Sequence, residues 1–336
     1  MTIRKKITIA NQNARGLQLV SDNMPDHVQP FMLEASQLRG RIVRLPQVLS
    51  RILGAHDYPK AISLLLAEAL CLTTLLARML KFDGIFTLQI RGEGPVRSLV
   101  CDMTHDGVLR GYVGYDEERL AEIDEDDRDF LTLLEKGYVA FTVDQANSDD
   151  RYQGITALHG VSLTESVQHY FHQSEQIKTG FVTHVTQLAD GTWNGGAVML
   201  QQLALAGGIY ADQAEPSENT AETVHSDRVH AGHDEDSWRR SMMLLQTLTK
   251  DELLDENLPL TDMLYRIFHE EGVRVFDTIS IVNGCRCSED KLRLVIDNIP
   301  EDEKQEIAED GVITATCEFC NTHYRFPVAK IIVQDQ

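Results

Sequence analysis

Four cysteines close to the C-terminus constrain this chain more than any other feature of its sequence. Cys285 and Cys287 form a C-x-C pair, and Cys317 and Cys320 form a C-x-x-C pair further along the chain. Two close pairs of thiolates can complete a tetrahedral Zn²⁺ site. The same four thiols can instead form two short-loop disulfides. The sequence therefore leaves two chemical states open for one cluster.

The size and charge of the chain narrow the classes of protein to which it can belong. It has 336 residues, of which 43% are hydrophobic and 25% charged, which is typical of a soluble globular protein with two or three domains. The formal net charge is -21. Such a surface repels phosphate backbones, so we expect no nucleic-acid partner.

The N-terminal segments do not predict secretion or a membrane span. Residues 1–20 are basic and have no long apolar stretch, so we expect a short disordered extension. Residues 61–80 are strongly apolar, but Glu68 and Arg78 lie among them, which favours a buried helix over a membrane span. Reduced, metal-ready cysteines are typical of the cytoplasm, and we expect the protein there, away from membranes.

Hydrophobic periodicity predicts a mixed α+β core over residues 21–204. Helical patterns are assigned to 28–53 and 61–80. A run of alternating strands follows, in which Phe86, Leu88 and Ile90 share one face. A helix is expected to begin at Ser162, with a further pair of strands before the core ends. The predicted strands of the central run are 85–92, 96–104, 108–115 and 138–144.

A change in composition predicts a flexible helical linker over residues 205–279. Its first part, 206–236, is acidic and poor in large apolar residues, so we expect it to be mobile. From Ser237 to Gly272 a helical pattern rich in Met and Leu resumes. This pattern is compatible with an ordinary packed linker, and also with an apolar surface that is covered in only one state of the protein.

The last unit, residues 280–336, is predicted to be a small zinc-binding domain. A unit of this size needs a crosslink or a bound ion as a staple to stay folded, and a metal ion is suitable. His323 is a further candidate ligand, but four thiolates already complete a zinc site. Thiolates are also the form of cysteine that peroxide attacks, and a sulfenic acid can condense with a neighbouring thiol. The metal site is therefore also a candidate redox switch.

Several further stretches, together with both cysteine pairs, carry a specific resemblance. They include LRGRIVRL (38–45), RYQG (151–154), YFHQSEQI (170–177) and LYRIFHEE (264–271). With these, the chain resembles the 33 kDa chaperonins, the bacterial holdase chaperones also called heat shock protein 33. The likeness extends from about Ser21 to Val333.

The resemblance implies a redox-regulated chaperone that binds unfolding proteins under oxidative stress without ATP, rather than an enzyme. It implies one Zn²⁺ held by Cys285, Cys287, Cys317 and Cys320 in an inactive reduced form. It also implies that oxidation forms the disulfides Cys285–Cys287 and Cys317–Cys320, releases zinc, unfolds the linker and promotes homodimerisation. The acidic insert 206–236 and the extension 1–20 depart from the family pattern.

One alternative of a different class stays open at this point. The chain could be an enzyme or a nucleic-acid-associated factor in which a zinc ribbon is purely structural. Gly92–Pro95 lacks the lysine and helix of a phosphate-binding loop, and no nucleophile–base arrangement stands out. Thiols that resist peroxide would favour this alternative.

Overall fold

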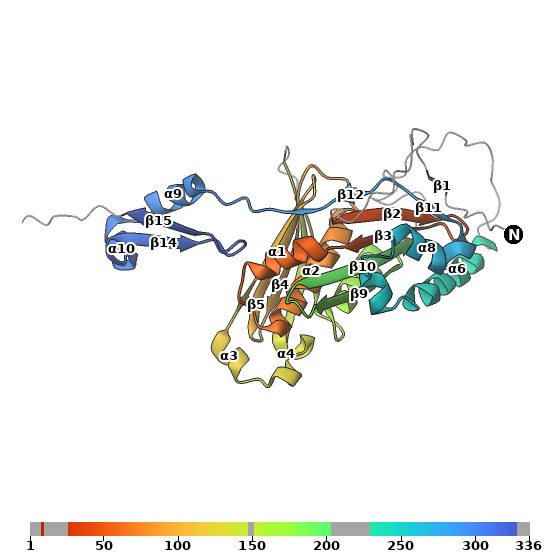
Figure 1. The fold of residues 1–336 in the computed structure, drawn as a ribbon, viewed down its shortest axis with the longest axis horizontal. Helices are drawn as coiled ribbons and strands as arrows, with labels where there is room; N and C mark the ends of the chain where they lie inside the picture. Colours follow the sequence, from red (N-terminus) through yellow and green to blue (C-terminus); the bar gives the residue numbers. More distant parts are fainter. Residues whose placement is uncertain (1–7, 10–25, 147–150, 203–228, 328–336) are drawn as a thin grey trace, which may run out of the picture.

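Two β-sheets with a long helix between them form the body of the protein (Figure 1). The computed structural model describes residues 8–9, 26–146, 151–202 and 229–327. The mixture of helices and sheets confirms the predicted α+β class. The predicted mobile insert, 206–236, lies mostly outside the described residues, as does the predicted extension 1–20 apart from Thr8 and Ile9.

The first sheet has seven strands among the described residues, and both of its faces are covered. Its order is β1 (Thr8–Ile9), β11 (Val273–Val275), β2 (His27–Leu33), β3 (Leu38–Arg44), β10 (Trp193–Gln202) and β9 (Thr179–Gln187), with β12 (Ile279–Ser280) paired to β2.

The second sheet has six described strands. Its order is β13 (Val282–Asn283), β6 (Val108–Tyr115), β5 (Val96–Thr104), β4 (Gly84–Gly92), β7 (Gly137–Gln145) and β8 (Arg151–Ala157). Phe86, Leu88 and Ile90 of β4 point into the core, as the alternation predicts. The four strands predicted from this alternation are confirmed as β4, β5, β6 and β7.

Helix α2 (Lys60–Ala77) lies between the two sheets and packs against strands of both. Of the described helices it alone is long and apolar enough to cross a membrane, and 78% of it is buried inside the structure. The predicted buried helix is therefore confirmed. Helices α1 (Pro46–Gly54) and α5 (Leu163–Tyr170) complete this layer, and α3 (Glu117–Ala121) and α4 (Phe130–Leu134) lie at one end of the second sheet.

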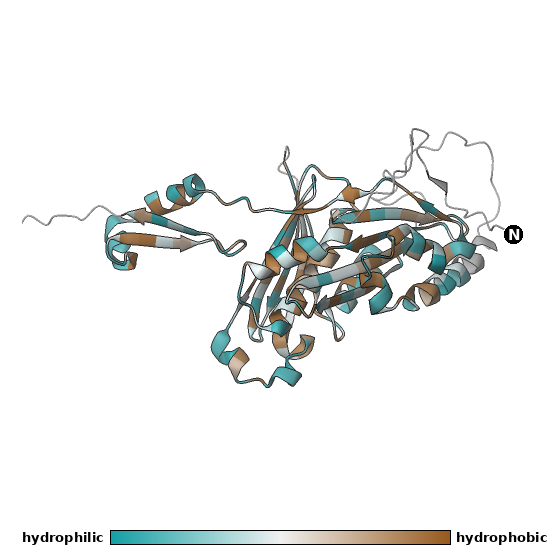
Figure 2. Ribbon diagram, viewed as in Figure 1, coloured by the Kyte–Doolittle hydropathy of each residue, from teal (hydrophilic) through white to brown (hydrophobic). Residues whose placement is uncertain are grey.

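The opposite face of the first sheet is covered by α6 (Val229–Gln246), α7 (Lys250–Leu254) and α8 (Leu260–Phe268). Because successive strand residues point to opposite faces, Ala197 and Met199 of β10 pack in the cluster around α2. Val198 and Leu200 pack against the Met- and Leu-rich helices. Figure 2 shows that brown, hydrophobic stretches occur in both the sheets and the helices that cover them.

The helix predicted for residues 28–53 is wrong over most of its length. The structure has the hairpin β2–β3 there, and a helix only from Pro46 onward. The apolar residues of β2 lie on both faces of the strand, since Val28 packs in the cluster around α2 and Phe31 and Leu33 pack under the covering helices. The spacing from Val28 to Phe31 therefore fits a helix as well as a strand. Pro46, with its fixed φ and missing N–H, is well suited to the first turn of the helix that does form.

Gly40 is required where the hairpin lies beneath an aromatic ring. It pairs in register with Phe31, and a Cβ at position 40 would lie 2.1 Å from Cζ of that ring. Phe31 in turn stacks on Phe268 of α8, with ring centroids 6.1 Å apart. The absence of a side chain at Gly40 therefore allows the sheet and the covering helix to make this contact.

We predict that Gly40→Ala destabilises the fold by about 1–3 kcal/mol, because the Phe31 ring must shift within a packed cluster. Urea unfolding followed by fluorescence or circular dichroism measures the change. Gly54→Ala is the matched control: no atom lies within 4 Å of the added Cβ, and alanine favours helix over glycine by up to about 1 kcal/mol. Equal stabilities for the two variants would contradict the packing described here.

Candidate metal centre

The described part of the C-terminal unit has only a small apolar core of its own. It consists of the hairpin β14 (Val312–Thr316) and β15 (His323–Pro327) with helices α9 (Glu289–Asp297) and α10 (Glu301–Ile307). Three buried residues, Ile296, Ile313 and Phe326, form its centre. So few apolar side chains provide little of the free energy that holds a domain together. This unit therefore depends on an additional bond or ion.

The four predicted cysteines meet at the end of this unit. Their Sγ atoms all lie within 4.8 Å of one another. Cys285 Sγ is 3.6 Å from Cys317 Sγ, and Cys287 Sγ is 3.5 Å from Cys320 Sγ. With Zn–S bonds of about 2.3 Å, the edges of a tetrahedral site are about 3.8 Å. The four sulfurs are thus close enough to hold a metal ion, and the donor set suits zinc.

Local turns bring each pair of cysteines to the centre. Cys285 and Cys287 follow β13, and Ser288 then caps the N-terminus of α9 by accepting a hydrogen bond from the Lys291 N–H. Cys317 follows β14, and the turn closes when the Asn321 N–H donates to the Cys317 carbonyl at 2.8 Å. Among the described residues, the cluster of metal-ligand groups consists of the cysteines alone and leaves out His323, whose Nδ1 lies 2.8 Å from Thr316 Oγ1.

The thiols influence one another strongly in the metal-free geometry. Burial raises the pKa of Cys285, but hydrogen bonds from Cys287, Cys320 and Cys317 outweigh it and lower the pKa to about 7. Burial, together with the neighbouring thiols, raises the pKa of Cys287 to about 12. Without a cation the cluster therefore cannot hold four thiolates at neutral pH, and metal binding must displace protons.

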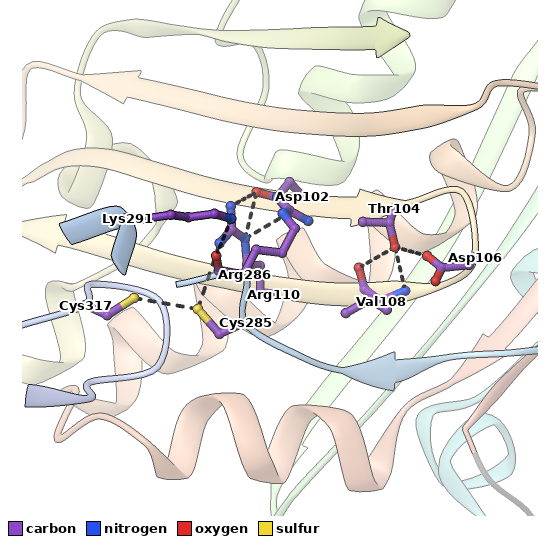
Figure 3. Close-up of polar contacts among 9 residues, drawn as sticks. All are labelled: Asp102, Thr104, Asp106, Val108, Arg110, Cys285, Arg286, Lys291 and Cys317. Atoms are coloured by element: carbon purple, nitrogen blue, oxygen red, sulfur yellow. Dashed lines mark hydrogen bonds and ion pairs between the residues drawn. The ribbon is translucent and has the colours of Figure 1, made fainter. Parts of the chain in front are cut away.

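Side chains of the second sheet contact this centre directly (Figure 3). Arg110 of β6 donates from Nη1 to Cys285 Sγ at 3.9 Å, and its guanidinium lies over the Phe319 ring at 3.7 Å. His56 Nε2 lies 3.4 Å from the Phe319 carbonyl oxygen. Sequence patterns alone do not single out these residues as part of the centre. The signal available was the opposite charges of Asp102 and Arg110, which pair in register across β5 and β6.

The comparisons with known proteins agree with this arrangement. A family model described as "Hsp33 protein" matches residues 26–327. The chain belongs to the Hsp33 family. The predicted resemblance is therefore confirmed.

Members of the Hsp33 family match the chain over nearly its whole length. The 33 kDa chaperonin of Caulobacter vibrioides (strain NA1000 / CB15N) is 36% identical over 311 residues, which cover 90% of this chain and 95% of that protein. The 33 kDa chaperonin of Ectopseudomonas mendocina is 34% identical over 310 residues, with 92% and 94% covered.

A solved structure shares the fold. The crystal structure of the 33 kDa chaperonin of Thermotoga maritima, a heat shock protein 33 homolog, superposes with a TM-score of 0.69 and 22% sequence identity. The match covers 90% of this chain and 94% of that chain.

Buried polar groups fix the covering helices to the first sheet, and residues of the family motifs provide them. Arg44 of LRGRIVRL donates to the carbonyl oxygens of Leu253 at 2.8 Å and Leu258 at 3.1 Å. Asn194 Nδ2 donates to the Leu254 carbonyl at 2.9 Å. The bonds to Leu253 and Leu254 satisfy carbonyl groups at the end of α7 that have no partner within the helix, and the bond to Leu258 holds the loop before α8.

Glu271, the last residue of LYRIFHEE, joins α6 to the turn between β2 and β3. This carboxylate is 2% exposed and accepts hydrogen bonds from Arg240 Nε at 2.5 Å and from the Ser36 hydroxyl. The hydrogen bond from Arg240 is the main reason why the pKa of Glu271 is below its usual value of 4.5.

We predict that Glu271→Gln destabilises the docking of α6 by about 1–2 kcal/mol at neutral pH, because a half-exposed arginine loses its charged partner. A carboxyl with a lowered pKa contributes stability above its unfolded pKa, and the contribution is lost as the pH falls through the folded pKa. The difference between wild type and variant should therefore be full at pH 7 and vanish well below pH 4.5.

Urea unfolding across this pH range provides the measurement. Glu270→Gln is the control, since the Glu270 side chain is 83% exposed and should change stability little at any pH. A pH-independent difference for Glu271→Gln would show that the carboxylate charge does not help to hold α6 through Arg240.

Proposed function

We propose that this chain is a redox-regulated, ATP-independent holdase chaperone that binds unfolding proteins under oxidative stress. The observation that carries the proposal is the position of the four-sulfur cluster. The short strands β11, β12 and β13 join this cluster to the helices that cover an apolar face of the first sheet. Membership of a family whose relatives are named chaperonins supports a chaperone in place of an enzyme.

In the reduced state, Cys285, Cys287, Cys317 and Cys320 are proposed to hold one Zn²⁺. The ion would keep the four side chains deprotonated and staple the C-terminal unit, a contribution of about 10–16 kcal/mol in zinc-finger peptides. This exceeds what the three buried residues of that unit can provide. In the reduced form the linker stays folded and the chaperone is inactive.

Oxidation is proposed to form the disulfides Cys285–Cys287 and Cys317–Cys320. In each, one thiolate attacks hydrogen peroxide, gives a sulfenic acid and releases water after protonation. The neighbouring thiolate then attacks that sulfur and displaces a second water. Each disulfide thus consumes one peroxide and two protons, and two electrons pass from sulfur to oxygen. Since all four ligands are consumed, the site no longer binds zinc.

The structure suggests how the loss of the staple reaches the apolar surface. Cys285 follows β13, which pairs with β6, and β12 and β11 pair with β2 directly before it in the chain. These strands have two or three residues each. If they detach, α8 loses its attachment, and the sheet face beneath it is uncovered. The residues concerned are Phe31, Leu33, Leu38, Ile42, Val198 and Leu200.

We propose the following organisation for this switch: an extension at 1–20, a core chaperone domain at 21–204, a redox-sensitive linker with an acidic insert at 205–279, and a zinc-binding redox-switch domain at 280–336. Clients are unfolded or partly folded proteins, which bind apolar surface. A homodimer in the oxidised state and a cytoplasmic location, without membrane or nucleic-acid partners, complete the proposal.

Oxidation of the purified zinc-loaded protein with peroxide under mild heat tests the function. We expect four thiols to be lost, one zinc to be released per chain and aggregation of a thermally unfolding client to be suppressed, as measured by light scattering. The reduced protein is the control. If the oxidised protein leaves client aggregation unchanged, the proposal is wrong. Thiols that resist peroxide would favour a purely structural zinc ribbon instead.

We predict that the double variant Cys285→Ser/Cys287→Ser loses zinc but keeps the core folded. Among the described residues, the apolar cluster around α2 contains nothing beyond Ile281, so the packing of the core does not require the metal. Zinc content and near-ultraviolet circular dichroism measure the two effects. Arg325→Ser, an exposed change on β15, is the control and should retain zinc. Global unfolding of the double variant would contradict the independence of the core.

A further inference from the structure

A buried ion pair on the second sheet faces the cysteine centre. The Arg110 guanidinium forms a two-pronged pair with Asp102, with Nε 3.0 Å and Nη2 2.9 Å from Oδ2. The Asp102 side chain is only 6% exposed and the Arg110 side chain 17%. A buried carboxylate of this kind holds its arginine in one orientation. Asp102 therefore fixes the direction in which the Arg110 guanidinium points.

The zinc-binding unit adds a second arginine to the same carboxylate. Arg286, which lies between Cys285 and Cys287, donates from Nη2 to Asp102 Oδ1 at 2.6 Å. Its Nη1 is buried and makes no hydrogen bond to the residues that the structure describes. We call Asp102, Arg110 and Arg286 the arginine clasp (Figure 3). With two guanidinium groups and one carboxylate, the clasp carries one net positive charge.

Arg110 contacts both of the loops that carry the cysteine pairs. Its Nη1 is 3.9 Å from Cys285 Sγ in the first pair. Its guanidinium lies 3.7 Å from the centroid of Phe319, which stands between Cys317 and Cys320. Tyr112 of the same strand packs edge-on against Phe319, with centroids 4.7 Å apart. One side chain of the core thus contacts the loops that carry all four sulfurs.

The charge that the clasp faces depends on the redox state of these sulfurs. Four thiolates around a divalent ion carry two net negative charges, whereas two disulfides carry none. A partly buried charge pair at this distance is screened less than a surface pair. The attraction between clasp and centre therefore exists in the reduced state and is lost on oxidation.

We propose that Arg110 is a positioning residue that couples the redox state of the cysteine centre to the core. It holds the zinc-binding unit on β6 while the sulfurs are thiolates and releases the unit when they become disulfides. Because β13 pairs with β6 at Val108 and Leu109, directly before Arg110, release of the clasp frees the first strand of the path to the linker. This inference rests on the proposed redox function and specifies how the switch is transmitted.

Amide hydrogen exchange of residues 279–287 tests the inference in the full chain. In the reduced, zinc-loaded protein, Arg110→Gln should speed exchange there roughly tenfold, as expected for the loss of a charged hydrogen bond. Four reduced thiols and one zinc per chain should remain. Arg110→Lys keeps the charge but loses the planar stacking, so it should give an intermediate rate.

Arg151→Gln is the matched control. Arg151 of β8 also pairs with an aspartate on the adjacent strand of the same sheet, since its Nε lies 2.9 Å from Oδ1 of Asp144 on β7. This pair lies on other strands than the arginine clasp. It should leave exchange at 279–287 unchanged. Phe319→Leu removes the stacking partner without altering the core, and it should also speed exchange in the reduced protein. This variant keeps the test valid if Arg110→Gln fails to fold.

The decisive comparison repeats the measurement after oxidation to two disulfides. Because the clasp is then already released, Arg110→Gln should no longer change the exchange rate relative to wild type. A merely structural role predicts the same acceleration in both redox states, and that result would overturn the inference, as would unchanged exchange in the reduced variants. The proposed function fails separately, if oxidised wild-type protein does not hold a client.

Discussion

The seven-stranded sheet has two apolar faces, and the rest of the structure follows from the need to cover both. One face packs on α2, which is itself buried between two sheets. The other packs on α6, α7 and α8, which lie on the outside of the body. A buried Leu or Phe contributes about 1.5–3 kcal/mol by leaving water. The second face is therefore apolar surface that is buried only while its helices stay in place.

The covering helices are held by contacts of two kinds that respond to different conditions. Apolar packing and the carbonyl bonds of Arg44 are independent of the redox state. The attachment through β11, β12 and β13 leads to the cysteine centre, where the arginine clasp faces charge that the proposed oxidation would remove. A small unit without much core of its own suits this proposed role, because its fold would depend on the ligands that an oxidant would consume.

The sequence predicted best those features that repeat at short range. In β4, Phe86, Leu88 and Ile90 are buried and the residues between them are less so, which gives the alternation that the sequence shows. The hairpin β2–β3 was assigned as a helix because Val28 and Phe31 lie on opposite faces of β2 and follow each other at a helical spacing. The proximity of the four cysteines was predictable from their paired spacing, since each pair is brought together by a local turn.

The clasp was not predictable in the same way. Asp102 and Arg110 look like an ordinary cross-strand pair, and their contact with Cys285 depends on the docking of a segment far along the chain. The same holds for Glu271, whose burial arises from the meeting of α6 with the turn after β2. Local sequence patterns predict helices and strands, whereas the role of a charged side chain depends on residues that are distant in the sequence.

The position of α2 has a consequence for whether the protein can be used more than once. Because the apolar cluster around this helix contains no described residue of the linker, the body can keep its shape if the outer helices are displaced. In the proposed switch, the uncovered sheet face would keep its arrangement of apolar side chains. Reduction of the cysteines would then let the linker pack on that face again, so that one molecule could act repeatedly.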